Sequence, residues 1–128
     1  MPAATVMVVD DAPAHRETLA KLLRREGYDA GGAADGQEAL RLLRQRSAPD
    51  LMLLDVTMPG LDGLDLLEML RDDPRWESLP VIMVTSCAES ECVERAEQLG
   101  AKEYILKASF SVGEMLGRVR QHTRYLPH

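Results

Sequence analysis

Short apolar runs alternate with helical patterns along the chain, and no other feature constrains its fold as strongly. Each apolar run has the length of a strand and is followed by a segment whose apolar residues recur at helical spacing. The predicted strands are 5–9, 28–34, 50–54, 80–85 and 103–106, and the predicted helices are 14–26, 36–46, 63–71, 89–99 and 111–123. Successive strand–helix units predict a parallel sheet with helices on both faces, a doubly wound (βα)5 fold of the α/β class.

The length of 128 residues fits one domain; we expect its core at 4–123 and a tail or linker start at 124–128. A formal net charge of -6 argues against direct binding to nucleic acid or anionic membrane. No apolar run reaches membrane-spanning length and no signal-peptide pattern is visible, so we expect a cytoplasmic protein. Cys87 and Cys92 lack the spacing of a zinc or redox CxxC motif and are interpreted as reduced thiols.

Two glycine pairs bear on how tightly the elements pack. Gly31 and Gly32 weaken the strand over 28–34, which we therefore place at an edge of the sheet. Gly113 and Gly117 lie about one turn apart in the last helix, where each costs about 1 kcal/mol relative to alanine. We interpret this second pair as a closely packed helix face, with a pliant helix as the minor alternative.

Acidic residues follow two of the predicted strands. Asp55 ends the apolar run 51–54 and enters a loop containing Pro59 and Gly60, while Asp10 and Asp11 follow the run 6–9. If these strands are parallel neighbours, three carboxylates meet at one sheet edge, where they repel one another by several kcal/mol at low dielectric. A divalent cation is the simplest neutralising group, and carboxylates with a cation indicate phosphate chemistry.

The carboxyl ends of the strands predict the complete site. Ligands bind at this edge of doubly wound sheets, and five polar residues are predicted there: Asp10, Asp11, Asp55, Thr85 and Lys107. Each residue alone is more typical of a turn, a helix cap or a solvated strand end. Their common position favours a joint chemical role.

Phosphoryl transfer to a carboxylate accounts for this set of residues. A carboxylate can attack phosphorus and form an acyl phosphate, for which Mg²⁺ is the suitable cation. We expect Asp11 and Asp55 as direct ligands, Asp10 as a water-mediated ligand or orienting base, and the backbone carbonyl of Thr57 as a further ligand. The Lys107 ammonium and Thr85 hydroxyl would contact the phosphoryl oxygens.

Several motifs in order resemble the receiver domains of bacterial two-component response regulators, the CheY-like group. They are VVDD at 8–11, DGQEAL at 35–40, DLMLLDVTMPGLDG at 50–63, PVIMVTS at 80–86 and GAKEYILK at 100–107. The resemblance implies a flavodoxin-like sheet of order 2-1-3-4-5. It also implies that Asp55 accepts a phosphoryl group from the phosphohistidine of a sensor kinase or phosphotransfer protein, with Mg²⁺ bound by Asp10, Asp11, Asp55 and the Thr57 carbonyl.

The resemblance further implies a conformational switch. Thr85 and Tyr104 would be the switch pair, in which the hydroxyl moves toward the phosphoryl group and the ring rotates into the vacated space. The chain departs from the family where Ala108 replaces the usual proline after Lys107. A cis bond before alanine costs about 2.5–4 kcal/mol, so this bond is either trans or held in strain. Cys87 near Thr85 is interpreted as a small hydrophobe, with a redox role as the minor alternative.

Three other functions compete with the phosphoacceptor. A Mg²⁺-dependent phosphatase of the haloacid dehalogenase type would have a second aspartate where this chain has Thr57. A flavin or nucleotide binder would need a Gly/Ser/Thr-rich first loop, whereas residues 10–13 are Asp-Asp-Ala-Pro. A receiver that works as a scaffold without phosphorylation would not need the complete Asp, Thr and Lys set. The downstream output partner is not predictable from these residues.

Overall fold

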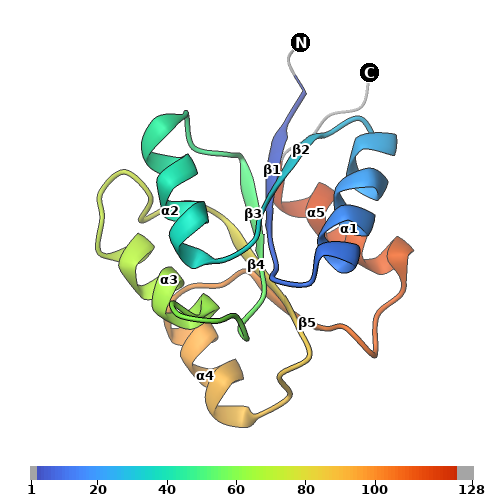
Figure 1. Cartoon of the computed structure of the whole chain (residues 1–128). Helices are drawn as coiled ribbons and strands as arrows, with labels where there is room; N and C mark the ends of the chain where they lie inside the picture. The colour runs from blue at the N-terminus through green and yellow to red at the C-terminus, as the bar shows by residue number, and fades with distance from the viewer. Residues whose placement is uncertain (1–2, 124–128) are drawn as a thin grey trace.

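A single parallel sheet organises the computed structural model, in which residues 3–123 are described (Figure 1). Its strands lie in the order β2-β1-β3-β4-β5, as expected. The strands are β1 (Thr5–Val9), β2 (Asp29–Ala33), β3 (Leu51–Leu54), β4 (Val81–Thr85) and β5 (Glu103–Leu106). The helices are α1 (Pro13–Arg25), α2 (Gly36–Gln45), α3 (Gly63–Arg71), α4 (Ser90–Gln98) and α5 (Val112–Thr123).

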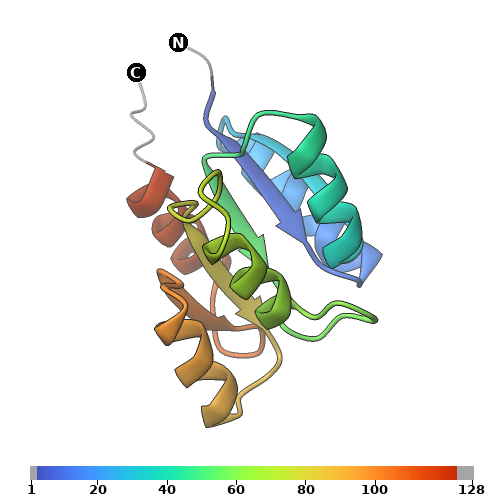
Figure 2. The ribbon, with the colours of Figure 1, turned by 90° about the vertical axis from the view of Figure 1, so that its left-hand side faces the viewer.

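Helices cover both faces of the sheet, as Figures 1 and 2 show. Helices α2, α3 and α4 pack on one face, and α1 and α5 pack on the other. The central strand β3 serves both cores because its side chains alternate: Met52 and Leu54 belong to the first, Leu51 and Leu53 to the second. Burial on both faces explains why the strand is apolar without interruption.

The two edge strands are less deeply buried than the central strands. Strand β2 lies at one edge, where Gly31 and Gly32 are exposed, which confirms the position predicted from this glycine pair. Strand β5 lies at the other edge, and all its residues are half-buried. The predicted switch residue Tyr104 lies on this edge strand.

Side-chain caps fix the starts of three helices. The Asp35 carboxylate accepts the Glu38 N–H, while the Glu38 side chain accepts the Ala34 N–H. The Asp62 carboxylate caps α3 by accepting the Asp65 N–H at 2.8 Å. At α5, the Ser111 hydroxyl accepts the Glu114 N–H at 3.1 Å.

The chain after β5 bears on two expectations, the packing of the glycine pair in α5 and the isomer of the Lys107–Ala108 bond. The predicted close packing of Gly113 and Gly117 is wrong, because a Cβ added at Gly117 would meet no atom within 4 Å and one at Gly113 only the Ser111 hydroxyl at 3.9 Å. The Lys107–Ala108 bond is trans, as are all peptide bonds of the described residues.

The tail predicted over 124–128 lies outside the described residues. Within residues 3–123, no helix combines the length and apolar character needed to span a membrane.

Candidate functional site

Three acidic residues meet at the carboxyl ends of β1 and β3. Asp10 and Asp55 are almost completely buried, with relative exposures of 2% and 5%, whereas Asp11 is exposed. The two strands are hydrogen-bonded neighbours, and the Asp55 N–H donates to the Val9 carbonyl at 3.0 Å. Carboxylate oxygens of all three residues lie within 4.8 Å of one another. The predicted acidic cluster is therefore present at the predicted sheet edge.

Lys107 joins the two buried carboxylates. Its Nζ lies 2.9 Å from Asp10 Oδ2 and 2.8 Å from Asp55 Oδ2. Burial would lower the pKa of Lys107, but the hydrogen bonds to Asp55 and Asp10 outweigh it and raise the pKa above its ordinary value. The lysine is consequently charged at neutral pH and neutralises part of the cluster.

Asp10 has further partners on α1 that the sequence did not reveal. His15 Nδ1 lies 2.6 Å from Asp10 Oδ2, and the Arg16 guanidinium donates to the Asp10 backbone carbonyl at 2.7 Å. The other carboxylate oxygen, Oδ1, accepts the Ala12 N–H at 2.9 Å. Burial would raise the pKa of Asp10, but the contacts with Ala12, Lys107 and His15 together lower it. Asp10 is therefore held as a carboxylate.

Asp55 is held by its own loop and by the start of α3. Its Oδ1 accepts the Thr57 N–H at 3.2 Å. The Gly63 N–H donates to the Val56 carbonyl at 2.8 Å, and a Cβ at Gly63 would clash with the Asp55 backbone carbonyl oxygen. Only glycine permits α3 to approach the loop so closely, so this residue fixes the position of Asp55.

Thr85 and Tyr104 are linked through one intervening residue. The buried Thr85 hydroxyl accepts the Cys87 N–H at 3.2 Å, and the Tyr104 hydroxyl donates to the Cys87 carbonyl at 2.7 Å. Burial, with the nearby thiols of Cys87 and Cys92, raises the pKa of Tyr104. The two predicted switch residues thus hold opposite sides of the same peptide segment, a link that their sequence positions did not indicate.

The donor set of the acidic cluster fits Mg²⁺. Three carboxylates with mutually close oxygen atoms are hard ligands, which Mg²⁺ prefers over nitrogen or sulfur ligands. Asp10, Asp11 and Asp55 are the residues that would hold the ion. Thr57 contacts Asp55 through its backbone N–H. This contact does not involve the Thr57 carbonyl, which stays a predicted ligand.

The fold and site define a doubly wound α/β module with an acidic centre at its switch point. Residues 6–120 match the model of the response regulator receiver domain family. The chain therefore belongs to this family of two-component signalling domains, as its motifs indicated, and the CheY-like fold predicted from them is confirmed.

Curated relatives include longer response regulators. The DNA-binding response regulator MtrA of Mycolicibacterium smegmatis is 37% identical over 119 residues, which cover 93% of this chain and 50% of the relative. The response regulator PleD of Caulobacter vibrioides is 36% identical over 123 residues, covering 95% of this chain and 26% of the relative. The chain thus spans half, or less, of the length of these relatives.

Solved receiver structures have the same fold. A response regulator receiver protein from Pseudomonas putida superposes with a TM-score of 0.89 at 31% identity, covering 94% of this chain and 98% of that chain. The chemotaxis protein CheY4 of Vibrio cholerae gives a TM-score of 0.85 at 27% identity, covering 94% of this chain and 98% of that chain. The chain is accordingly a regulatory receiver domain, consistent with a phosphoacceptor role in two-component signalling.

Proposed function

We propose that Asp55 is the phosphoacceptor of this receiver domain. The observation that carries this proposal is the state of its carboxylate: one oxygen is held by the Thr57 N–H and the other by Lys107 Nζ, beside two further acidic residues. A buried carboxylate fixed in this way is a nucleophile with little freedom to reorient. It would attack phosphorus of a phosphohistidine, forming a P–O bond as the P–N bond breaks and the imidazole leaves with a proton.

Each neighbour of Asp55 has a role in this proposal. Lys107 would move from the carboxylates to the phosphoryl oxygens and stabilise their charge. The Thr85 hydroxyl would donate to the same phosphoryl group. Mg²⁺ bound by Asp10, Asp11, Asp55 and the Thr57 carbonyl would supply charge neutralisation between carboxylate and phosphoryl oxygens. The domain would thereby support its own phosphorylation and dephosphorylation.

The switch would act through the segment between Thr85 and Tyr104. A Thr85 hydroxyl that turns toward a phosphoryl group on Asp55 must change its contact with the Cys87 N–H. The Tyr104 hydroxyl holds the carbonyl of that same residue, so displacement of the segment alters the ring's position. The face formed by α4, β5 and α5 would change as a result, and a partner would read this change.

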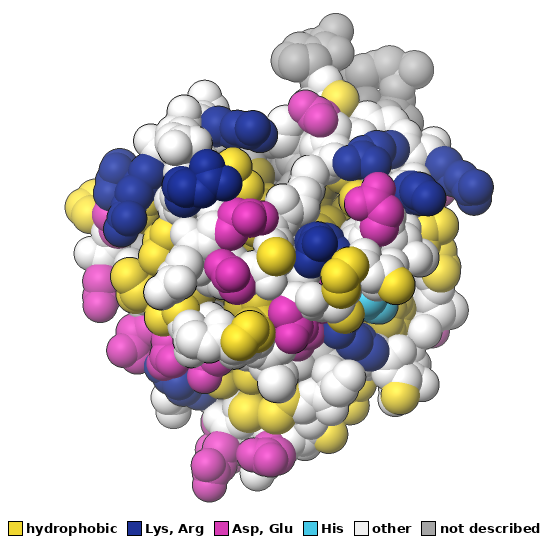
Figure 3. All heavy atoms as spheres, in the orientation of Figure 1, with side chains coloured by type: hydrophobic (Ala, Val, Ile, Leu, Met, Phe, Trp, Pro, Cys, Tyr) yellow, Lys and Arg dark blue, Asp and Glu magenta, His cyan; other side chains and the backbone are white. Residues whose placement is uncertain are grey.

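Membership of the receiver family supports a proposal for the partners and the location. A sensor histidine kinase or a phosphotransfer protein would donate the phosphoryl group, and the cytoplasm would be the compartment. The output partner or output domain is not specified by the residues described. In the view of Figure 3, acidic side chains gather over α3 and α4, where Glu68, Glu91, Glu94 and Glu97 are exposed. Such a surface supports a protein partner rather than direct nucleic acid binding by this domain.

Intact mass spectrometry tests the proposal. The protein is incubated with Mg²⁺ and acetyl phosphate, and Asp55→Asn is compared with Asp50→Asn, an aspartate at the opposite end of the same strand. We expect a Mg²⁺-dependent, hydroxylamine-labile gain of one phosphoryl group by the native chain and by Asp50→Asn, but not by Asp55→Asn. Absence of any adduct from folded native protein, together with no response to beryllofluoride, would instead support a phosphorylation-independent scaffold.

A further inference from the structure

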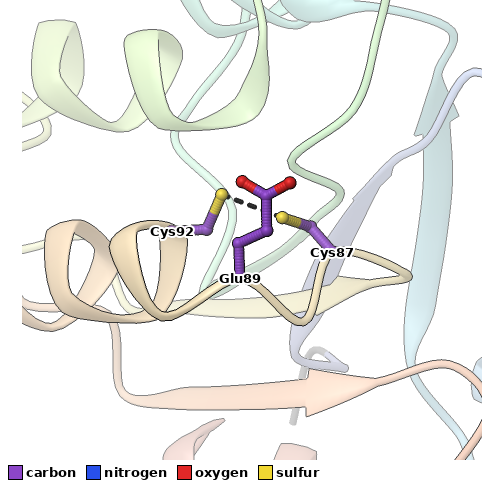
Figure 4. A group of neighbouring side chains, drawn as sticks. All are labelled: Cys87, Glu89 and Cys92. Atoms are coloured by element: carbon purple, nitrogen blue, oxygen red, sulfur yellow. Dashed lines mark hydrogen bonds between the residues drawn. The ribbon is translucent and has the colours of Figure 1, made fainter.

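Cys87 and Cys92 form a closely spaced dithiol beside the switch segment. Cys87 lies in the loop after β4 and Cys92 in the first turn of α4, and their Sγ atoms are 2.8 Å apart (Figure 4). Both side chains are half-buried and pack against the core beneath α2, α3 and α4. They are the two cysteines of the chain and both are free thiols.

We propose that this pair is a reversible disulfide site that controls the switch segment. Bonded sulfur atoms are about 2.05 Å apart, so the two thiols need only a small approach to form the bond. Figure 4 shows the two sulfur atoms joined by this contact, and the Glu89 side chain crosses the line between them in that view. A bond between residues five apart would tie the loop after β4 to the helix that follows it.

The oxidant in this proposal is a small-molecule disulfide, which reacts with the two cysteines by thiol–disulfide exchange. The Cys87 thiolate attacks the small disulfide, forming a mixed disulfide and releasing one thiol. The Cys92 sulfur then attacks the Cys87 sulfur, forming the internal bond and releasing the second thiol. The protein loses two electrons and two protons, and both are carried away by the two released thiols.

The surroundings of Cys92 determine the order of these steps. Its hydrogen-bonded contact with Cys87, burial and the carboxylates of Glu89 and Asp62 raise the pKa of Cys92 to about 11. Cys92 is therefore a protonated thiol at neutral pH and a poor first nucleophile. Its contact with Cys87 nevertheless places it to close the internal bond once Cys87 carries the mixed disulfide.

The consequence for signalling rests on the proposed function. The Cys87 N–H is bound by Thr85 and its carbonyl by Tyr104, so a covalent link at Cys87 restrains both switch residues. The sulfur atoms are in contact while Thr85 and Tyr104 both hold Cys87, so the disulfide favours this arrangement over one in which the Thr85 contact has changed, as the proposed switch requires. We expect oxidation to weaken the response to a phosphoryl mimic by about fivefold or more.

Metal binding is the alternative to a disulfide at this site, because Glu89 lies beside the two thiols. Its carboxylate and the two thiols have ligand atoms within 4.8 Å of one another, and Figure 4 shows the three side chains together. A soft divalent ion such as Zn²⁺ would use these ligands. The disulfide is favoured because Glu89 is exposed and the sulfur atoms are in direct contact, with less separation than ligands around an ion require.

Thiol trapping tests the disulfide. The protein is equilibrated with reduced and oxidised glutathione in the presence of a chelator and is then alkylated with iodoacetamide. Its intact mass is measured by mass spectrometry. We expect a monomer two hydrogens lighter with no added alkyl group, while Cys92→Ser takes up one glutathione instead. Retention of two alkylated thiols, or only mixed disulfides in the native chain, would overturn the proposal. Stoichiometric Zn²⁺ that survives desalting without chelator and blocks oxidation would assign the pair to metal ligation and also overturn it.

A second measurement tests the link to the switch. Reduced and oxidised proteins are titrated with Mg²⁺ and beryllofluoride by isothermal titration calorimetry, and the control is the double variant Cys87→Ser/Cys92→Ser, which has no thiol, treated in both buffers. We expect the half-saturating concentration to rise about fivefold or more on oxidation of the native chain and to stay unchanged in the control. Equal half-saturating concentrations for the reduced protein and for protein shown to contain the disulfide would overturn the regulatory part of the proposal. A disulfide in a chain that forms no phosphoryl adduct would contradict the proposed function and leave the redox site standing.

Discussion

At the scale of single residues, the carboxylate oxygens of the site are already in contact with basic side chains. Asp10 Oδ2 contacts both Lys107 Nζ and His15 Nδ1, and Asp55 Oδ2 contacts the same ammonium. A bound cation or phosphoryl group therefore replaces interactions that already exist, rather than filling a neutral pocket. Lys107 offsets part of the repulsion between the two buried carboxylates.

Lys107→Ala is expected to destabilise the metal-free protein by about 3 kcal/mol, because it leaves two buried carboxylates without their shared cation. Mg²⁺ should restore more stability to this variant than to the native chain, because the ion then replaces the missing charge. Urea unfolding with and without Mg²⁺ measures both effects, with Lys102→Ala, an exposed lysine before β5, as the control. Equal metal-free stability of the two variants would contradict this role of Lys107.

Gly63→Ala should destabilise the fold by about 2 kcal/mol or more, because its Cβ would overlap the Asp55 carbonyl and displace the loop. Gly117→Ala is the matched control, since a Cβ there meets no atom within 4 Å. It should stabilise α5 by about 0.5–1 kcal/mol. Thermal unfolding of both variants checks that the free energy of unfolding changes in opposite directions. A stabilising Gly63→Ala would show that the Asp55 loop is not packed as described.

Tyr104→Phe is expected to lower stability at neutral pH by about 1 kcal/mol through loss of the hydrogen bond to the Cys87 carbonyl. Burial raises the pKa of Tyr104 above 10.0, so the neutral phenol stabilises the fold below that pH. Above it, the unfolded chain loses a proton that the folded chain keeps, and the native advantage declines. Urea midpoints of both proteins across this range should converge; a constant difference would rule out the shifted phenol.

At the scale of secondary structure elements, the helices differ in how firmly they are held. Helix α3 buries Leu64, Leu66, Leu67 and Leu70, whereas α4 buries only Ala96. Ion pairs from Arg95 to Asp65 and Glu68 join the two helices, but all three side chains are substantially exposed, so these pairs contribute little. A helix with few buried contacts opens readily, which suits α4 to a switch that involves its N-terminal turn.

Arg71 is the strongest polar link between α3 and the turn after α4. Its guanidinium donates to backbone carbonyls of Leu99 at 2.7 Å and Leu79 at 2.9 Å, and more weakly to Trp76, Glu77 and Gly100. We expect Arg71→Met to destabilise the protein by about 2 kcal/mol, since these carbonyls lose a charged donor. Urea unfolding checks this, with Arg75→Met as the exposed control. Equal effects of the two substitutions would contradict the role of Arg71.

At the scale of the whole molecule, much of the fold and the grouping of the three acidic residues could be predicted from the sequence. Apolar runs and helical spacing identified each element, because buried parallel strands and amphipathic helices have distinct periods. The acidic cluster also followed, because the carboxyl ends of neighbouring parallel strands must meet at one edge. The parallel direction of the strands followed from the alternating strand–helix units, whereas the order that makes β1 and β3 neighbours came from the resemblance to receiver domains.

Features that depend on how helices dock were not predicted. The contact of His15 with Asp10 requires the exact rotation of α1, and the contact of Arg71 with distant carbonyls requires the path of the connections around it. The Cys87–Cys92 contact depends on a turn that spacing alone does not specify. Gly117 was wrongly assigned to a packed face, because glycine in a helix has the same sequence signature whether the space beside it is filled or empty.

Mapping the phosphoryl group to a single residue tests the central claim most directly. The acetyl phosphate-treated protein is reduced with borodeuteride, which converts an aspartyl phosphate to deuterated homoserine, and the peptides are sequenced by tandem mass spectrometry. The account predicts one labelled position, Asp55, and loss of the label when Mg²⁺ is withheld. A label at Asp10 or Asp11, or none in a chain that has gained a phosphoryl group, would contradict it.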